Sequence, residues 1–165
     1  MANATRIPVG TLKVANTSNV KEMKNGRPMN VKLEGADLEN CVIVTLAEQP
    51  VDQKENDHVF VGTVLEAAAV ADAVKAGTAY LVVAPEIMVE EARKTDGHIG
   101  KFRFENGGVY TAYQLHAHDR IEVSSTHRYA TGAGKVISTR PMAEAMYLLA
   151  EEDKVAAIQM VKIEF

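Results

Sequence analysis

Apolar and polar positions alternate with a period of two along much of this chain, which is the pattern of half-buried β-strands. Two further runs are apolar throughout, and they predict strands that are buried on both faces. The alternating segments are residues 101–105, 109–115, 121–123 and 160–165, residues 58–65 are also strand-like, and the apolar runs are 41–46 and 80–84. The chain is therefore predicted to be rich in short strands.

Turn residues separate these segments at the spacing of 8–12 residues that is typical of sandwiches and barrels. Asn25-Gly26 has the form of a hairpin turn, and the polar residues 49–57 predict a loop. The alanine-rich residues 66–75 precede Gly77 and predict a short helix or a turn, because glycine is a favoured residue just after a helix end. We expect a mostly β fold, a compact β-barrel or β-sandwich with eight to ten strands and short helices.

The first 30 residues are polar and contain several turn residues. They predict an extended N-terminal arm (1–30) in front of a single β-rich domain (31–165), with a flexible terminus as the alternative. Ordering such an arm costs about 1–2 kcal/mol per residue in backbone entropy, so its apolar residues are expected to dock on a partner. The residues expected to carry this docking are Arg6, Ile7, Val9, Leu12 and Val14.

Charge and hydropathy narrow the classes of partner. The formal net charge is -4 and no basic run is present, which argues against nucleic-acid binding. No stretch approaches the ~20 apolar residues of a membrane helix, and the first residues lack the pattern of a signal peptide. The single cysteine, Cys41, fits a reducing cytoplasm and lies in an apolar run, which predicts a buried hydrophobic side chain rather than a nucleophile.

The strongest chemical candidate is the series His116, His118 and Glu122. Residues two apart in a strand share a face, so both imidazoles would be able to bind one metal ion. The spacing resembles the first metal motif of cupins, but its opening glycine and a second motif with a further histidine are absent. We predict no stoichiometric metal and no cofactor. A cupin-like metal-dependent enzyme or sugar-binding protein is the alternative.

Other catalytic patterns are weaker. Residues 131–135 resemble the end of a phosphate-binding loop, but Tyr129 and Val136 stand where glycine and Ser or Thr are needed. Ser124 or Ser125 with His127 and Asp119 lacks the nucleophile elbow of a hydrolase. The acidic residues Glu86, Glu90 and Glu91 are expected to form a solvated face rather than an acid–base pair. The chain is therefore predicted not to be an enzyme.

A strand ending in Val83, Ala84, Pro85 and Glu86 is followed by a charged connector and then by Tyr113, Leu115, Asp119 and Val123. This order resembles small head-decoration (auxiliary capsid) proteins of tailed bacteriophages. The resemblance implies a non-enzymatic virion protein that binds the major capsid protein on the capsid surface and contacts neighbouring copies, after assembly in the host cytoplasm. Another virion part, such as a tail or head–tail joining protein, is a further alternative.

Overall fold

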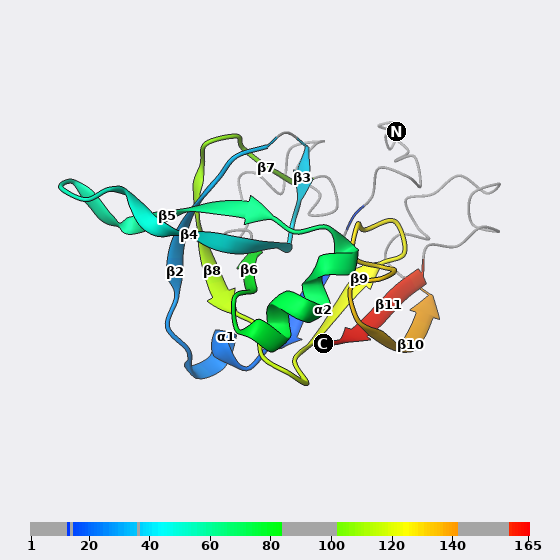
Figure 1. Cartoon of the computed structure of the whole chain (residues 1–165). Coiled ribbons are helices and arrows are strands. Elements are labelled where there is room, and N and C mark those ends of the chain that lie inside the picture. Colours follow the sequence, from blue (N-terminus) through cyan, green and yellow to red (C-terminus); the bar gives the residue numbers. More distant parts are fainter. Residues whose placement is uncertain (1–12, 14, 36, 84–101, 142–158) are drawn as a thin grey trace, which may run out of the picture.

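The computed structural model describes residues 13, 15–35, 37–83, 102–141 and 159–165. Within these residues it contains eleven strands and two helices, so the predicted mostly β fold is confirmed. Five strands close into a barrel, and a four-stranded sheet lies beside it (Figure 1). The elements are β1 (Ala15–Asn19), α1 (Glu22–Asn25), β2 (Met29–Leu33), β3 (Leu38–Glu39), β4 (Val42–Asp52), β5 (Asn56–Val64), α2 (Ala67–Ala76), β6 (Tyr80–Val83), β7 (Arg103–Phe104), β8 (Val109–Gln114), β9 (Arg120–Ser124), β10 (Lys135–Pro141) and β11 (Gln159–Glu164).

The barrel strands follow the order β2-β5-β4-β6-β8, and β8 pairs with β2 to close it. Only the β2–β5 pair is parallel. The first apolar core fills the barrel interior, and four of its eight buried residues are valines, among them Val31 and Val44. A Cβ atom on Gly62 would lie 2.5 Å from Val31 Cγ1, so this position of β5 requires glycine. Phe104, on the short strand β7, is buried against the same cluster.

The four-stranded sheet has the order β1-β9-β11-β10 and is antiparallel throughout. A second apolar core lies between this sheet and the barrel, and it includes Ile43 and Leu81. Their strand neighbours Val42, Val44 and Val82 are buried in the first core instead. Strands β4 and β6 are therefore buried on both faces where they are apolar throughout, as predicted.

Helix α2 covers the junction between the barrel and the second sheet (Figure 1). Its buried residues Val70 and Val74 are four positions apart and so lie on the same face. Gly77 ends the helix in the left-handed region (φ 72°), and its N–H contacts the carbonyls of Ala73 and Val74. The predicted alanine-rich helix is confirmed. No helix in the described part of the chain is long and apolar enough to cross a membrane.

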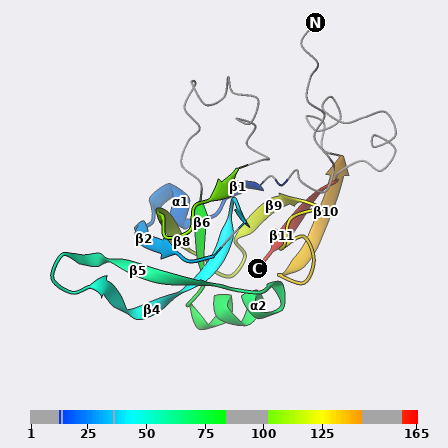
Figure 2. The ribbon, with the colours of Figure 1, turned by 90° about the horizontal axis from the view of Figure 1, so that it is seen from above.

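The prediction of a polar loop over residues 49–57 is wrong. Strand β4 continues to Asp52 and β5 begins at Asn56, so this segment is the outer part of a β-hairpin. Both views show the hairpin projecting from the body of the molecule (Figures 1 and 2). Its side chains are polar because neither face is covered, so the alternation that marks a half-buried strand is missing.

Residues 15–30, which were expected to belong to the arm, are part of the folded domain. Ala15 pairs with Val123 of β9, and Val20 is fully buried in the second core. Asn25-Gly26 ends helix α1 and does not form a hairpin turn, since Gly26 N–H donates to Glu22 C=O. Strand β1 is polar because it is paired along its backbone but covered little by side chains.

Candidate functional site

His116 and His118 do not lie on a strand, contrary to the expectation from their spacing. They occupy the turn between β8 and β9, and His118 has a left-handed backbone (φ 71°). Asp119 organises this turn: its Oδ2 accepts the His116 N–H at 2.8 Å, and its Oδ1 accepts the Lys21 N–H at 3.0 Å. A short side chain that binds nearby backbone groups favours a turn over a continued strand.

Each member of the expected metal set has a different partner. His116 Nε2 lies 2.9 Å from Glu22 Oε1, and His118 Nδ1 lies 3.6 Å from Glu164 Oε1. Glu122 is bound by the Arg140 guanidinium on β10, and this hydrogen bond lowers the pKa of the carboxyl. No group of three metal-binding side chains converges within the described residues. The cupin-like arrangement of these three residues is therefore not formed.

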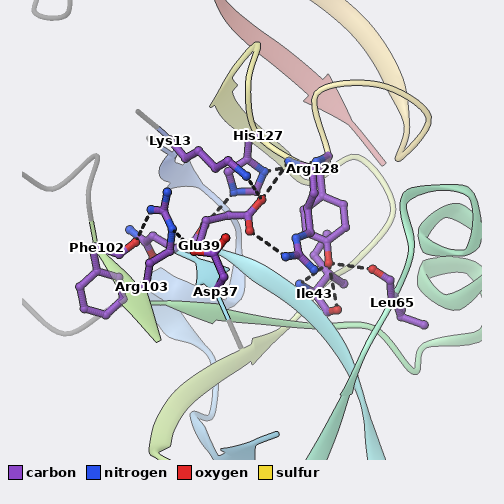
Figure 3. A network of polar contacts seen from close by, with 11 residues as sticks. Lys13, Asp37, Glu39, Ile43, Leu65, Phe102, Arg103, His127 and Arg128 are labelled. Carbon is purple, nitrogen blue, oxygen red and sulfur yellow. Dashed lines mark hydrogen bonds and ion pairs between the residues drawn. The ribbon is translucent and has the colours of Figure 1, made fainter. Parts of the chain in front are cut away.

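A buried polar cluster surrounds Glu39, and it was not predicted (Figure 3). We call it the Glu39 network; its members are Lys13, Glu39, Asn40, His127 and Arg128. Glu39 is fully buried, and its Oε2 accepts a 2.8 Å hydrogen bond from Arg128 Nη2. The Arg128 backbone N–H donates to Oε1 at 3.0 Å, and Lys13 Nζ lies 3.7 Å from the same oxygen.

The electrostatics of Glu39 follow from these contacts. Burial raises the pKa of the carboxyl, but the Arg128 hydrogen bond and two backbone hydrogen bonds outweigh it and hold the pKa at about 2. Glu39 is thus ionised at neutral pH and compensated by the two cations. Arg128 Nε is buried and has no hydrogen-bond partner in the described part of the protein. The guanidinium is therefore held mainly through Glu39.

Residues 127–129 fasten the loop after β9 to the barrel. His127 Nε2 lies 2.7 Å from the Asn40 carbonyl oxygen, and burial lowers the pKa of this imidazole. The Tyr129 hydroxyl accepts the Ile43 N–H at 2.9 Å and donates to the Leu65 carbonyl at 2.9 Å. Burial raises the pKa of Tyr129 to about 12, so the hydroxyl stays protonated and able to donate.

Of the remaining chemical candidates, those that the structure describes have contacts within the fold. Burial raises the pKa of Cys41 to about 12, which keeps its thiol protonated and confirms a buried apolar role. His127 contacts the Asn40 carbonyl and Asp119 contacts backbone N–H groups, so they do not form a triad with Ser124. The glycine-containing residues 131–135 lead from a series of turns into β10 and not from a strand into a helix. Glu86, Glu90 and Glu91 lie outside the described residues.

The structure describes five of the positions on which the resemblance to phage decoration proteins rests. Leu115 and Val123 are fully buried in the second core, and Asp119 holds the β8–β9 turn. Tyr113 is a half-buried residue of β8, and Val83 ends β6. Leu115 and Val123 therefore contribute to the packing of the fold.

Two exposed surfaces remain. The first, which we call the finger, is the outer part of the β4–β5 hairpin, residues 47–58. The second is β10, whose seven residues are all exposed, including Val136 and Ile137. A shallow depression of about 400 Å³ also lies beside α1; it is lined by Glu22, Gly26, Arg27, Met29, Tyr80 and Gln114.

The expected docking residues Arg6, Ile7, Val9, Leu12 and Val14 lie outside the described residues. Lys13 contacts Glu39, and β1 begins at Ala15. No protein family, curated protein or solved structure was found to match this chain.

Proposed function

We propose that this protein is a non-enzymatic virion protein that binds the outside of a bacteriophage capsid and stabilises the shell. The proposal starts from the sequence resemblance to head-decoration proteins, carried by positions such as Leu115, Asp119 and Val123. A protein of this kind needs contacts across neighbouring capsid subunits rather than a catalytic centre. Each copy that binds only the assembled shell stabilises that shell by mass action.

The observation that carries the proposal is the anchoring of the chain just after its first 12 residues. Lys13 lies 3.7 Å from the buried carboxylate of Glu39, and residues 15–19 pair with β9 as an added strand. The segment before Lys13 contains Ile7 and Val9, which alternate as in a strand. A segment fixed at its root and apolar further out is suited to adding a strand to a neighbouring sheet edge.

The proposal assigns capsid binding to residues that the folded domain does not need for its stability. Substituting Ile7→Asp together with Val9→Asp should leave the fold intact and reduce binding to expanded capsids of the encoding phage by at least tenfold. The matched control is Asn3→Asp with Thr5→Asp, which adds the same charge to the same segment at polar positions. If both double variants cosediment with capsids as the full chain does, the first 12 residues are not the docking element.

The tail and head–tail joining alternatives differ in location only. Immunogold labelling of intact virions with antibody raised against the purified chain distinguishes them: label over the whole capsid surface supports decoration, and label confined to the tail or to one vertex contradicts it.

A further inference from the structure

The finger and strand β10 lie at opposite ends of the molecule. In both views the hairpin projects from one side of the barrel, while β10 is on the far side of the second sheet (Figures 1 and 2). Within the described residues, β10 ends its sheet, because β11 is its only strand partner there. Two unlike surfaces at opposite ends of one chain are the requirement for a head-to-tail contact between copies.

The charges of the two surfaces are opposite. The finger carries four acidic residues against a single lysine, and β10 carries Lys135 and Arg140 with no acidic residue. Arg140 is bound by Glu122 of β9, so Lys135 is the cation of β10 that remains for a partner. The neighbouring strand β11 adds Lys162 opposite Ser138, and its Glu164, opposite Lys135, is bound by Arg120. The acidic residues of the finger are Glu48, Asp52, Glu55 and Asp57.

Exposed apolar side chains accompany the charges at both ends. Val51 of the finger is 42% exposed, and on β10 Val136 is 48% and Ile137 is 37% exposed. The outer half of β4 also has an open backbone edge in the described structure, because β6 pairs only with Val42, Ile43 and Val44. A two-stranded hairpin without a covered face is marginally stable in water. A partner that covers one side of the finger would therefore stabilise it.

We propose that the finger of one copy docks on β10 of the next copy, with its exposed acidic residues Glu48 and Glu55 against Lys135 and Lys162 and with Val51 against Val136 and Ile137. This contact is heterologous, so repeating it forms a closed ring or an open chain of copies. The inference does not rest on capsid binding, since it concerns two surfaces of the same chain. If the capsid proposal also holds, the contact is the one that links neighbouring copies on the shell.

The test uses two charge-reversed variants of the full chain. The finger variant carries Glu48→Lys and Glu55→Lys, and the edge variant carries Lys135→Glu and Ile137→Glu. These positions are exposed and avoid Asp52 and Arg140, which bind within the molecule. The control is Asp72→Lys on α2, an exposed acidic residue away from both surfaces. Circular dichroism establishes that each variant is folded.

Sedimentation velocity over a concentration series should show that the natural chain and the control associate above the mass of one 17.9 kDa chain, and more weakly in high salt. Each variant alone should be monomeric, and a mixture of the two should associate again, since each supplies a surface that the other has lost. A natural chain that is monomeric throughout overturns the proposal. So does association that survives in either variant alone, as a contact between like surfaces would give, and so do variants that stay monomeric when they are mixed.

Discussion

Glu39 Oε2 accepts a 2.8 Å hydrogen bond from Arg128 Nη2, and the two residues are 89 positions apart in the sequence. The bond joins the strand just before β4 to the loop after β9, and Lys13 joins the same carboxylate from the N-terminal side. A buried carboxylate that loses its cations, or cations that lose their carboxylate, leave an uncompensated charge inside the protein. This network therefore fixes the loop and the root of the N-terminal segment together.

Replacing Glu39 with glutamine should destabilise the protein by about 3 kcal/mol at pH 7, because Arg128 would remain in place without its charged partner. The folded-state pKa of Glu39 is about 2, below its usual value of 4.5. A lowered pKa contributes stability above the unfolded value, and this contribution is lost as the pH falls from about 4.5 towards 2. Urea unfolding at several pH values should show the difference between the natural chain and E39Q shrinking over that interval.

Glu34→Gln is the control for this experiment, because Glu34 is an exposed carboxylate whose side chain is 61% accessible. It should change stability by less than about 0.5 kcal/mol at every pH. An E39Q penalty that is constant from pH 7 to pH 3 would show that the charge of Glu39 does not stabilise the folded state.

The hydroxyl of Tyr129 is expected to stabilise the folded protein through its hydrogen bonds, apart from the packing of the ring. Tyr129→Phe keeps the ring but leaves the Ile43 N–H and the Leu65 carbonyl without this partner inside the protein. The cost should be about 1–3 kcal/mol in the free energy of unfolding. Tyr110→Phe removes a hydroxyl that accepts one bond from Glu105 N–H at an exposed turn, and it should cost less. Equal costs for the two variants would contradict the account of Tyr129.

One added carbon at position 62 should destabilise the folded protein, because the barrel interior has no room for it. Gly62→Ala places a methyl group 2.5 Å from Val31 Cγ1 and 3.2 Å from Val44 Cγ2, so unfolding should become easier by about 1–3 kcal/mol. In the double variant with Val31→Ala, the removed methyl groups make room for the new one. A double-mutant cycle should then give a combined cost smaller than the sum of the single costs. Strictly additive costs would mean that the two positions are not in contact.

The length of an N-terminal truncation should decide whether the domain remains stably folded. Removing residues 1–12 should leave the cooperative unfolding transition in place. Removing residues 1–20 also deletes Lys13, strand β1 and the fully buried Val20, so the domain should lose several kcal/mol or fail to fold. Thermal unfolding of the two truncated chains compares them directly. Equal stability would mean that β1 contributes nothing to the folded domain.

The sequence predicted the elements that carry a local signal, such as an apolar run or a glycine after a helix. Strands β4 and β6 are apolar where they face two cores, and Gly77 marks the end of α2, so local pattern and structure agree there. The finger and β1 were not predicted, because exposed strands carry no alternation. Their pairing depends on backbone hydrogen bonds and on partners far away in sequence.

The Glu39 network, like the finger and β1, was not predictable from the sequence. Nothing near Glu39 distinguishes it from a surface carboxylate, and its partner Arg128 lies in a loop between β9 and β10. The place of His116 and His118 depends on a neighbouring residue in the same way: their spacing is correct for a strand, but Asp119 accepts hydrogen bonds from backbone N–H groups and makes a turn instead. A motif indicates which residues are available, and the turn chemistry of its neighbours decides where they point.

Cosedimentation of the purified full chain with expanded capsid shells of the phage that encodes it tests the central proposal most directly. The proposal predicts that the chain pellets with the shells in a saturable manner and at a fixed number of copies per capsid subunit, and that the Ile7→Asp/Val9→Asp variant stays largely in the supernatant. A folded full chain that remains in the supernatant at every concentration, with shells present and intact, would contradict the assignment to the capsid surface.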